Sequence, residues 1–523
     1  MHERPRPSVR WAASALLLAL GLSACAGPGD DEPEDGPAGT QEAPGAAEEA
    51  GEDDERLSEF YDQELTWEDC GTGMQCTDVA VPVDYEDPED GSLELAVVAD
   101  STDPELDYVL TNPGGPGESG VDMVTEQLSG TVSEEVRDQL NVVGFDPRGV
   151  HRSEGVECMT DEEMDEYREL EDDPELDADT AFGESQEQAA EIGEQCAERT
   201  GDLLAHVDTF SAARDMDIIR GALDQNELHY MGFSYGTKLG MAYAELFPEQ
   251  VGRFALDAMM DVTNGAHELT VAQGVGFEDA LEGFAEWCVE DEQCPIAGTP
   301  EDVVETVQQM FADVDEEPVT VEPEGRTVNA SMLVSGFIAP MYSPEGWPHL
   351  AEGLQLALEE DDYYAFMFWA DQQAGRTPAG EYDWMSSWAF RSVMCLDYEM
   401  ASEQEEIEAE LEELTEQAPT FGPYLGHSGV LCSEWPHEPV SDGWEPGSIA
   451  GRELPEMLMV GTTGDPATPV QWAEQMHEAV PASSLITYEG EGHVAYRPGN
   501  ECVTDIVDAW LVEGELDNGR HSC

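Results

Sequence analysis

Short apolar runs alternate with longer helical patterns through much of this chain. The runs are rich in β-branched and other apolar residues, and they are too short to be helices. Near-continuous apolar runs that alternate with helical patterns predict buried parallel strands joined by crossover helices. The chain is therefore predicted to be α/β, with a mostly parallel central sheet flanked by helices. The predicted strands are Val79–Val83, Leu93–Ala99, Tyr108–Thr111, Asn141–Phe145, Leu228–Phe233, Arg253–Leu256, Glu456–Gly461 and Ser484–Tyr488.

The alternation of predicted strands and helices stops between residues 261 and 453. This segment is rich in tryptophan, methionine and acidic residues, and its helical patterns lack alternating strands. Examples are Pro300–Asp315 and Ser402–Gln417. The segment is predicted to be a helical cap, or lid, inserted into the sheet domain. The core would then consist of residues 60–260 and 454–523.

Residues 1–25 have the features of an export signal. Several arginines precede an apolar stretch, Trp11–Ala24, which is too short to span a bilayer. The stretch ends in Leu-Ser-Ala-Cys, which resembles the lipobox of bacterial lipoproteins and predicts a diacylated Cys25. The alternative is a plain secretory signal with a cleavage site near a cysteine.

Residues 26–59 contain glycine, proline, alanine and acids but no aromatic residue. Such a segment cannot bury apolar surface and is expected to be a solvated tether. It would hold a folded domain that begins near Phe60 away from the membrane, which the chain meets only through lipid at Cys25. The protein is expected to be extracellular, either membrane-anchored or secreted.

The charge of the chain is strongly unbalanced. Asp and Glu total 118 and Lys and Arg total 19, so the formal net charge is 19 − 118 = −99. Nucleic acids and anionic membranes need clustered cations, so both are excluded as partners of the body of the chain. Repulsion at this density destabilises a compact state, and salt screens it. The composition favours adaptation to saline surroundings; the alternative is an acidic protein made highly soluble by its charge.

Eleven cysteines leave an even set of ten once Cys25 is removed. An exported protein with an even set is most simply disulfide-bonded, and pairing of neighbours along the chain is the preferred hypothesis. A zinc site is the competing use, but neither CxxC nor HExxH occurs, so no metal or other cofactor is expected. The neighbours are Cys70/Cys76, Cys158/Cys196, Cys288/Cys294, Cys395/Cys432 and Cys502/Cys523.

Gly232-Phe233-Ser234-Tyr235-Gly236 is a G-x-S-x-G motif between a predicted strand and a predicted helix. The pattern alone is weak, but this context is that of a sharp strand-to-helix turn, where side chains flanking the serine would clash. Such a turn exposes the serine Oγ, and the helix N-terminus stabilises negative charge. Ser234 is therefore the predicted nucleophile; the alternative is a glycine-rich turn with an incidental serine.

A nucleophilic serine needs a base, and the base needs an orienting acid. Asp465 and His493 each follow a predicted strand in the last part of the chain. The order Ser, Asp, His is that of α/β-hydrolases, which predicts a Ser234–His493–Asp465 triad. Asp257 is the rival acid, because it also lies just past a predicted strand and some hydrolases carry the acid there.

Acyl transfer also needs hydrogen-bond donors for the oxyanion. The segment Asn112–Gly117 follows the strand Tyr108–Thr111, and its two prolines have no N–H to offer. Gly115 N–H and Tyr235 N–H are the predicted donors, with Gly114 as the reserve. The alternative for this segment is a simple Gly/Pro turn.

Several stretches together resemble the secreted tripeptidyl aminopeptidases of actinobacteria, relatives of proline iminopeptidases in the α/β-hydrolase superfamily. The resemblance extends from about Cys70 to Cys523, and it implies an α/β-hydrolase fold and removal of short peptides, typically tripeptides, from free N-termini. Two positions depart from the family pattern: Lys238 replaces a usual aromatic residue and Ala258 a usual glycine. The matching stretches are TNPGGPGESG (111–120), GFDPRGVHRSE (144–154), GFSYGTKLGMAYAELFPEQVGRFALDAMMD (232–261), MCLD (394–397), CSEWP (432–436), GTTGDPATPVQWAEQM (461–476) and GEGHVAY (490–496).

Three functions remain open from the sequence. The first is a serine exopeptidase, which needs a carboxylate to bind the substrate ammonium. Asp397 and Glu399 are the candidates, since they lie in the stretch resembling the family's C-x-D segment. The second is an esterase or lipase-like hydrolase with the same triad and no such carboxylate. The third is a catalytically inactive peptide-binding lipoprotein, against which the complete triad argues.

Overall fold

The computed structural model describes residues 56–71, 73–170, 176–382, 386–426, 428–440, 454–516 and 519–523. The predicted export signal, Cys25 and most of the predicted tether lie outside these residues. The end of the predicted tether 26–59 is packed against the core instead of solvated: Leu57 is fully buried and precedes the short helix α1 (Ser58–Tyr61). No helix in the described ranges is both long and apolar enough to cross a membrane.

A ten-stranded sheet in the order β1-β2-β3-β5-β4-β6-β7-β10-β11-β12 forms the centre of the molecule. The pairings from β1 to β5 are antiparallel, and every pairing from β5 to β12 is parallel. All the predicted strands are confirmed; the short edge strands β1 and β12 are additional. The strands are β1 (Glu68–Gly71), β2 (Met74–Pro82), β3 (Ser92–Ala99), β4 (Tyr108–Asn112), β5 (Asn141–Phe145), β6 (Leu228–Phe233), β7 (Val251–Asp257), β10 (Leu458–Gly464), β11 (Ser484–Glu491) and β12 (Arg520–Ser522).

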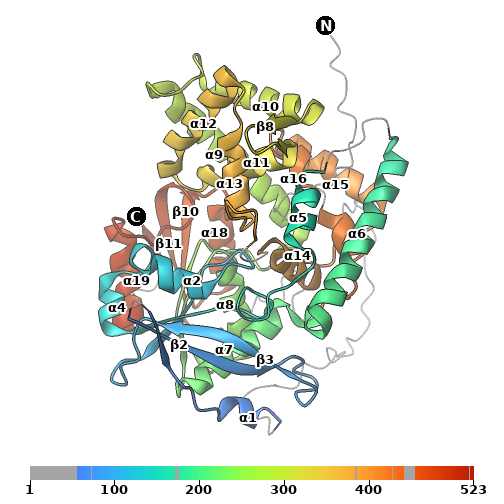
Figure 1. Cartoon of the computed structure of the whole chain (residues 1–523). Helices are drawn as coiled ribbons and strands as arrows, with labels where there is room; N and C mark the ends of the chain where they lie inside the picture. The colour runs from blue at the N-terminus through green and yellow to red at the C-terminus, as the bar shows by residue number, and fades with distance from the viewer. Residues whose placement is uncertain are drawn as a thin grey trace, which may run out of the picture.

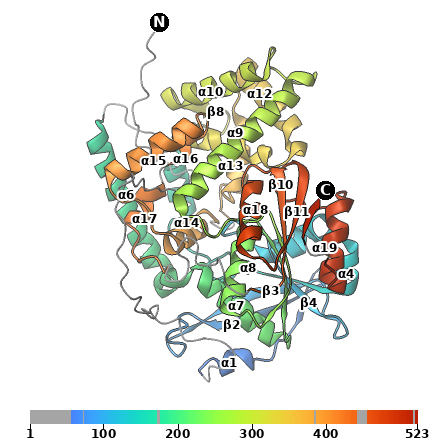
Figure 2. The same cartoon turned by 180° about the vertical axis from the view of Figure 1, so that it is seen from behind.

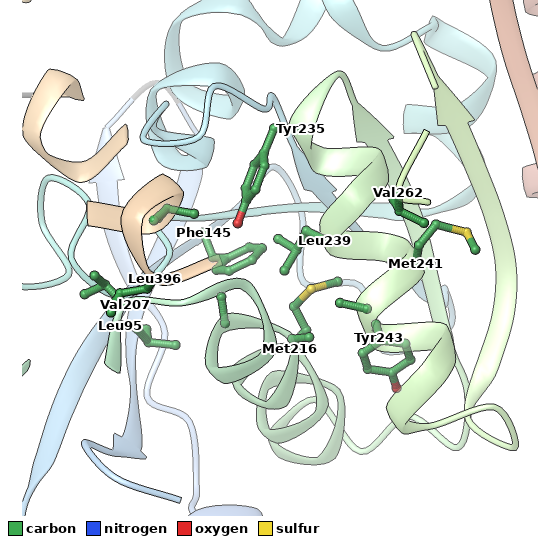
Figure 3. Close-up of a cluster of buried hydrophobic side chains, with 14 of the residues drawn as sticks. Leu95, Phe145, Val207, Met216, Tyr235, Leu239, Met241, Tyr243, Val262 and Leu396 are labelled. Atoms are coloured by element: carbon green, nitrogen blue, oxygen red, sulfur yellow. The ribbon is translucent and has the colours of Figure 1, made fainter. Parts of the chain in front are cut away.

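Helices cover both faces of the sheet, as a buried parallel sheet requires (Figures 1 and 2). In β6, Tyr230 packs toward one face and Met231 toward the other. Figure 3 shows the first face, where Tyr235, Leu239 and Met216 meet in one apolar cluster. This face carries α7 (Thr209–Ala222), α8 (Tyr235–Leu246) and α18 (Val470–Ala479); the other carries α2 (Gly120–Asp122), α3 (Leu128–Thr131), α4 (Glu134–Gln139) and α19 (Glu501–Glu513).

The segment predicted to be a cap forms a helical body with an apolar core of its own, which Figure 1 shows above the sheet. Aromatic rings of Phe311, Phe337 and Phe421 meet in that core. A small hairpin, β8 (Val319–Val321) with β9 (Arg326–Val328), was not expected. The cap helices are α9 (Ala266–Glu290), α10 (Pro300–Glu316), α11 (Ala330–Ile338), η3 (Ala339–Tyr342), η4 (Pro344–Gly346), α12 (Trp347–Glu360), α13 (Tyr364–Gln373), α14 (Ser386–Asp397), α15 (Gln404–Gln417), α16 (Gly422–Leu425) and α17 (Ser428–Ser433).

A second chain segment joins the cap. Helix α6 (Ala178–Thr200) lies beside the cap helices in both views, and helix α5 (Asp161–Arg168) lies beside them in Figure 1, although the sequence places both in the core segment 60–260 (Figures 1 and 2). Ion pairs fix α5 there: Arg168 lies 2.7 Å from Asp371 of α13, and Arg376 lies 2.6 Å from Asp165. The cap therefore consists of two segments held together partly by charge.

The neighbour pairing of cysteines is confirmed. One bridge links α14 to α17 through Cys395 and Cys432, and another secures α6 through Cys196. These covalent links brace the cap and its second segment. The bridges are Cys70–Cys76, Cys158–Cys196, Cys288–Cys294, Cys395–Cys432 and Cys502–Cys523.

Candidate active site

Ser234 occupies a sharp turn between β6 and α8. Its backbone has φ 54° and ψ −123°, a conformation that costs a non-glycine residue free energy. Glycine is required on both sides: a Cβ on Gly232 would lie 2.5 Å from the Gly236 carbonyl oxygen, and one on Gly236 would lie 2.7 Å from the Asn112 carbonyl oxygen. The flanking glycines thus let three backbone segments meet around a half-buried serine.

Hydrogen bonds hold the strained turn in place. The Ser234 N–H donates to the Asp257 carbonyl at 3.0 Å, and the Thr237 N–H and Oγ1 donate to the Ser234 carbonyl at 2.8 and 2.6 Å. The Thr237 hydroxyl oxygen in turn accepts from Met260 N–H at 2.9 Å. These hydrogen bonds stabilise the strained backbone conformation of Ser234.

Asp465 and His493 form a close pair at the carboxyl ends of β10 and β11. The His493 Nδ1–H donates to Asp465 at 2.9 Å to Oδ1 and 3.0 Å to Oδ2. The Asp465 carboxylate is buried and also accepts from the N–H groups of Ala467 and Thr468 and from the Thr468 hydroxyl, each at 2.9 Å. These donors orient the carboxylate, which fixes the imidazole with Nε2 left for chemistry.

The charge of Asp465 sets the protonation of His493. Burial by itself would lower the pKa of the imidazole, but the Asp465 charge and hydrogen bond outweigh it, and the pKa is raised from 6.5. Strands β6, β7, β10 and β11 are adjacent and parallel, so Ser234, Asp465 and His493 follow strand ends at one edge of the sheet. The described residues contain no Ser234–His493 hydrogen bond; in free enzymes this bond often forms only with substrate.

Asp257, the rival acid, makes a different set of contacts. Its buried carboxylate accepts from the N–H groups of Ala258 (2.7 Å), Ala495 (3.0 Å) and Tyr496 (2.6 Å). It therefore supports the loop that follows His493, and the imidazole is paired with Asp465 instead. Ala258, one of the two departures from the family pattern, has φ 58°, which explains why glycine is usual there.

The predicted oxyanion loop lies against the serine turn. A Cβ on Gly114 would lie 3.0 Å from Ser234 Cβ and 3.1 Å from Tyr235 N. The Gly114 N–H already donates to Asn112 Oδ1 at 3.0 Å, which removes the reserve donor. Within the described residues, Gly115 N–H and Tyr235 N–H have no acceptor, so both remain available for an oxyanion.

The cap touches the predicted catalytic residues directly. The Tyr342 carbonyl accepts from His493 N–H at 2.8 Å, and the Tyr342 ring meets the imidazole edge-on at 5.4 Å between centroids. At the oxyanion loop, a Cβ on Gly117 would lie 2.8 Å from the Ser386 carbonyl of α14. Cap segments therefore meet the site both at the histidine and at the oxyanion loop.

Asp397 does not present a free carboxylate. Its Oδ2 lies 2.7 Å from Lys238 Nζ, and both side chains are 4% exposed. Thr209 donates to Asp397 Oδ1 through its N–H at 2.9 Å and to Oδ2 through its hydroxyl. This geometry does not fit the ammonium-binding hypothesis, because a cation already neutralises the group. Glu399 is exposed, and no contact in the described part of the chain brings it toward Ser234.

Lys238 is the other departure from the family pattern. Its ammonium pairs with Asp397 and lies 3.8 Å from the centroid of the Tyr398 ring, so it joins α8 to the cap helix α14. Thr209, which donates to the same carboxylate, is also 2.7 Å from the Tyr235 hydroxyl. The lysine thus belongs to a buried network behind the serine turn.

Three residues near the site were not singled out from the sequence. Thr468 lies in the GDPAT stretch that carries Asp465, and this turn-forming sequence could have indicated that its hydroxyl lies near the Asp465 carboxylate. Glu118 directly follows the oxyanion loop, which was the signal for it. Tyr342 lies in the cap, and no local pattern distinguishes it. The described residues contain no group of three or more His, Cys, Asp or Glu that could hold a metal ion.

Comparisons with known proteins show which family the chain belongs to. The TAP-like protein family model matches residues 418–523. The serine protease Hip1 of Mycobacterium tuberculosis is 31% identical over 470 residues, which cover 86% of this chain and 87% of that protein. Carboxylesterase B of the same organism is 32% identical, covering 84% and 85%, and the tripeptidyl aminopeptidase of Streptomyces coelicolor is 28% identical, covering 88% and 86%. The chain therefore belongs to the tripeptidyl aminopeptidase-like family of α/β-hydrolases, and it is a serine hydrolase.

Proposed function

We propose that this serine hydrolase is an exported exopeptidase that releases short peptides, chiefly tripeptides, from free N-termini. Ser234 is the nucleophile, His493 the general base and acid, and Asp465 the residue that orients the imidazole. Gly115 N–H and Tyr235 N–H stabilise the oxyanion. The signal features of residues 1–25, the lipobox-like stretch at Cys25 and the disulfide set support export and anchoring at the outer face of the cell membrane.

The proposed reaction uses these groups in turn. Ser234 Oγ attacks the scissile carbonyl carbon while its proton passes to His493 Nε2. The tetrahedral intermediate collapses as the imidazolium gives that proton to the leaving amine, so the C–N bond breaks and an ester to the N-terminal fragment remains. Water, deprotonated by His493, attacks the ester, and the fragment leaves with a new carboxylate while Ser234 regains its proton.

The contact between the cap and His493 carries the exopeptidase proposal. Tyr342 packs edge-on against the imidazole, and α14 abuts the oxyanion loop at Gly117. Cap segments therefore contact the site at two places, beside His493 and at the oxyanion loop, and restrict the room between them. A site restricted in this way suits the end of a peptide, which can enter without its middle being threaded across the serine.

The test is to digest unblocked peptides of about eight residues and identify the products by mass spectrometry over time. We expect N-terminal tripeptides to accumulate first, with the remainder shortened by three residues at a time. N-acetylated copies of the same peptides should resist cleavage. The Ser234→Ala variant, purified identically, should release nothing and thereby exclude a contaminating peptidase.

The second candidate is an esterase, which the name of the carboxylesterase B relative favours. An esterase would hydrolyse simple acyl esters rapidly, leave the peptides intact and show no preference for a free amine. An inactive peptide-binding protein would cleave neither class, and a serine-directed phosphonate would not label it. Either result would contradict the proposed function.

A further inference from the structure

Glu118 lies next to the proposed oxyanion donors. A Cβ on Gly115 would lie 3.3 Å from Glu118 Cγ and 3.0 Å from its backbone nitrogen. The Glu118 N–H is also 3.4 Å from the Gly114 carbonyl oxygen, so the loop folds back on itself. The Glu118 side chain therefore extends from the same tight turn that carries Gly115 N–H.

The Glu118 side chain reaches solvent, but the surrounding protein limits how well water solvates its carboxylate. The side chain is exposed, yet the protein around it removes enough bulk water to raise the pKa of the carboxyl to about 7, with a smaller contribution from Asp122. Asp122 is itself paired with Arg152 at 2.6 Å. Within the described residues, no cation or hydrogen-bond donor contacts the Glu118 carboxylate. A carboxylate in this state is available to an incoming cation.

The Glu118 carboxylate is close enough to Tyr342 of the cap to influence its hydroxyl. Burial, and after it the charges of Asp465 and Glu118, raise the pKa of the Tyr342 hydroxyl. The same ring packs edge-on against His493. Glu118 is therefore close to the cap residue that covers the predicted catalytic histidine.

We propose that the Glu118 carboxylate binds the α-ammonium group of the substrate's N-terminus. This proposal rests on the exopeptidase function and names the group that would make the enzyme select free amines. Transferring an ammonium group from water to a closed site is unfavourable unless an opposite charge meets it. The unpaired, poorly solvated carboxylate supplies that charge.

The position of Glu118 also limits the length of the released fragment. An extended peptide advances about 3.3–3.6 Å per residue. The scissile carbonyl is held at Gly115 N–H, and Glu118 projects from the same folded loop, so its carboxylate reaches only an amine that is a few residues away. An anchor this close to the oxyanion loop favours short released fragments over long ones.

Two other acids are less suited to this role. Asp397 is neutralised by Lys238. Glu491, at the end of β11, lies against Gly464, and burial together with Asp279 and Glu286 of α9 raises the pKa of its carboxyl. These contacts direct it toward α9, whereas Glu118 stands beside the oxyanion donors. Glu491 therefore serves as the competing position in the test.

The experiment compares a chromogenic tripeptide ester that has a free amine with its N-acetylated form. We expect the wild type to prefer the free amine, and Glu118→Gln to lower kcat/KM for the free-amine ester by about 10- to 100-fold, the value of a charge-assisted hydrogen bond. The loss on the acetylated ester should be much smaller, which also shows that the catalytic site is intact. Glu118→Asp should retain part of the preference, because it keeps the charge and shortens the reach.

Glu126→Gln is the matched control, since Glu126 is an exposed acid on the same segment. It should leave kcat/KM for both esters unchanged. If the wild type prefers the free amine and Glu118→Gln keeps that preference, or if Glu491→Gln abolishes it, the role of Glu118 is overturned and the exopeptidase function stands. If the wild type hydrolyses both esters equally, the exopeptidase function fails, and the role of Glu118 with it.

Discussion

The ammonium of Lys238, the single lysine of the chain, lies 2.7 Å from Asp397 Oδ2 in a site where both side chains are 4% exposed. The two residues are 159 positions apart, one on the helix that follows Ser234 and the other at the end of cap helix α14. An ion pair buried in this way links the cap to the sheet domain. Its removal tests whether Asp397 is structural or meets substrate.

Lys238→Met should destabilise the protein, because it leaves the buried Asp397 carboxylate without its cation. Removing one partner of a buried pair costs about 3–5 kcal/mol, and the Thr209 donors should keep the loss at the lower end. The free energy of unfolding from urea titration would measure this. A double-mutant cycle with Asp397→Asn should show strong coupling.

The opposite pattern would restore the ammonium-binding role for Asp397. In that case Lys238→Met would have little effect on stability. Asp397→Asn would then lower kcat/KM for free-amine substrates without lowering it for acetylated ones. Because the chain has no second lysine, no other ammonium side chain can replace Lys238 in the variant.

Ser234→Ala should reduce kcat by at least about 10³-fold and leave the fold intact. The backbone angle of Ser234 allows a sharper expectation. Because φ is 54° there, Ser234→Gly should be more stable than Ser234→Ala by about 1 kcal/mol, the strain that glycine avoids. Thermal melts of the two inactive variants would measure the difference, and equal melting temperatures would argue against strain at the turn.

The acid limb of the pH profile should report His493. Only the neutral imidazole accepts the serine proton, so kcat/KM is lost as pH falls through the pKa of His493. Asp465 raises that pKa, so the midpoint should lie above 6.5. The pH dependence of kcat/KM with an acetylated ester would measure this midpoint. The Glu118→Gln variant should show the same loss of activity in acid. If that loss disappeared in the variant, it would have to be assigned to Glu118 instead of His493.

Strands and the positions of the candidate triad were predictable because their signals are local. The run Leu228–Phe233 is apolar throughout, and Ser234 follows it in a glycine-flanked turn. Asp465 and His493 likewise follow strand ends, so parallel pairing alone brings their backbones to one edge of the sheet. Each of these inferences needs only a short window of sequence and the rule that parallel strands share their ends.

Contacts across the cap were not predictable in the same way. The acidic residue at 397 was visible as a candidate, but its lysine partner is far away along the chain and nothing local links them. Tyr342 reaches His493 only because η3 packs beside the end of β11, and α5 joins the cap through ion pairs such as Arg168–Asp371. Such positions depend on how the finished layers pack.

Salt should stabilise the fold. The net charge of −99 produces self-repulsion that ions screen, and the screening length falls from about 10 Å at 0.1 M to about 3 Å at 1 M. The melting temperature should therefore rise steadily with NaCl up to about 2 M. Sucrose, which acts by exclusion and not by screening, is the control. A melting temperature independent of NaCl would refute adaptation to saline surroundings.

Glu410 offers a test of charge inside the cap. It lies on α15, one carboxylate oxygen is buried without a hydrogen-bond partner among the described residues, and burial together with Glu406, Glu268 and Glu413 raises the pKa of the carboxyl to about 7. A carboxyl whose pKa is raised on folding stabilises the fold most at low pH. That contribution is lost as pH rises from about 4.5 to about 7, because the charged form is then favoured only in the unfolded chain.

Glu410→Gln should therefore change stability in a pH-dependent way. Near pH 5 the glutamine resembles the protonated acid, so the melting temperature should barely change; near pH 8 it replaces a poorly solvated charge, so the melting temperature should rise. Glu412→Gln, which alters an exposed acid on the same helix, is the control and should show the same small effect at both pH values. Equal shifts for Glu410→Gln at the two pH values would show that its carboxyl titrates normally, and the buried-acid interpretation would be wrong.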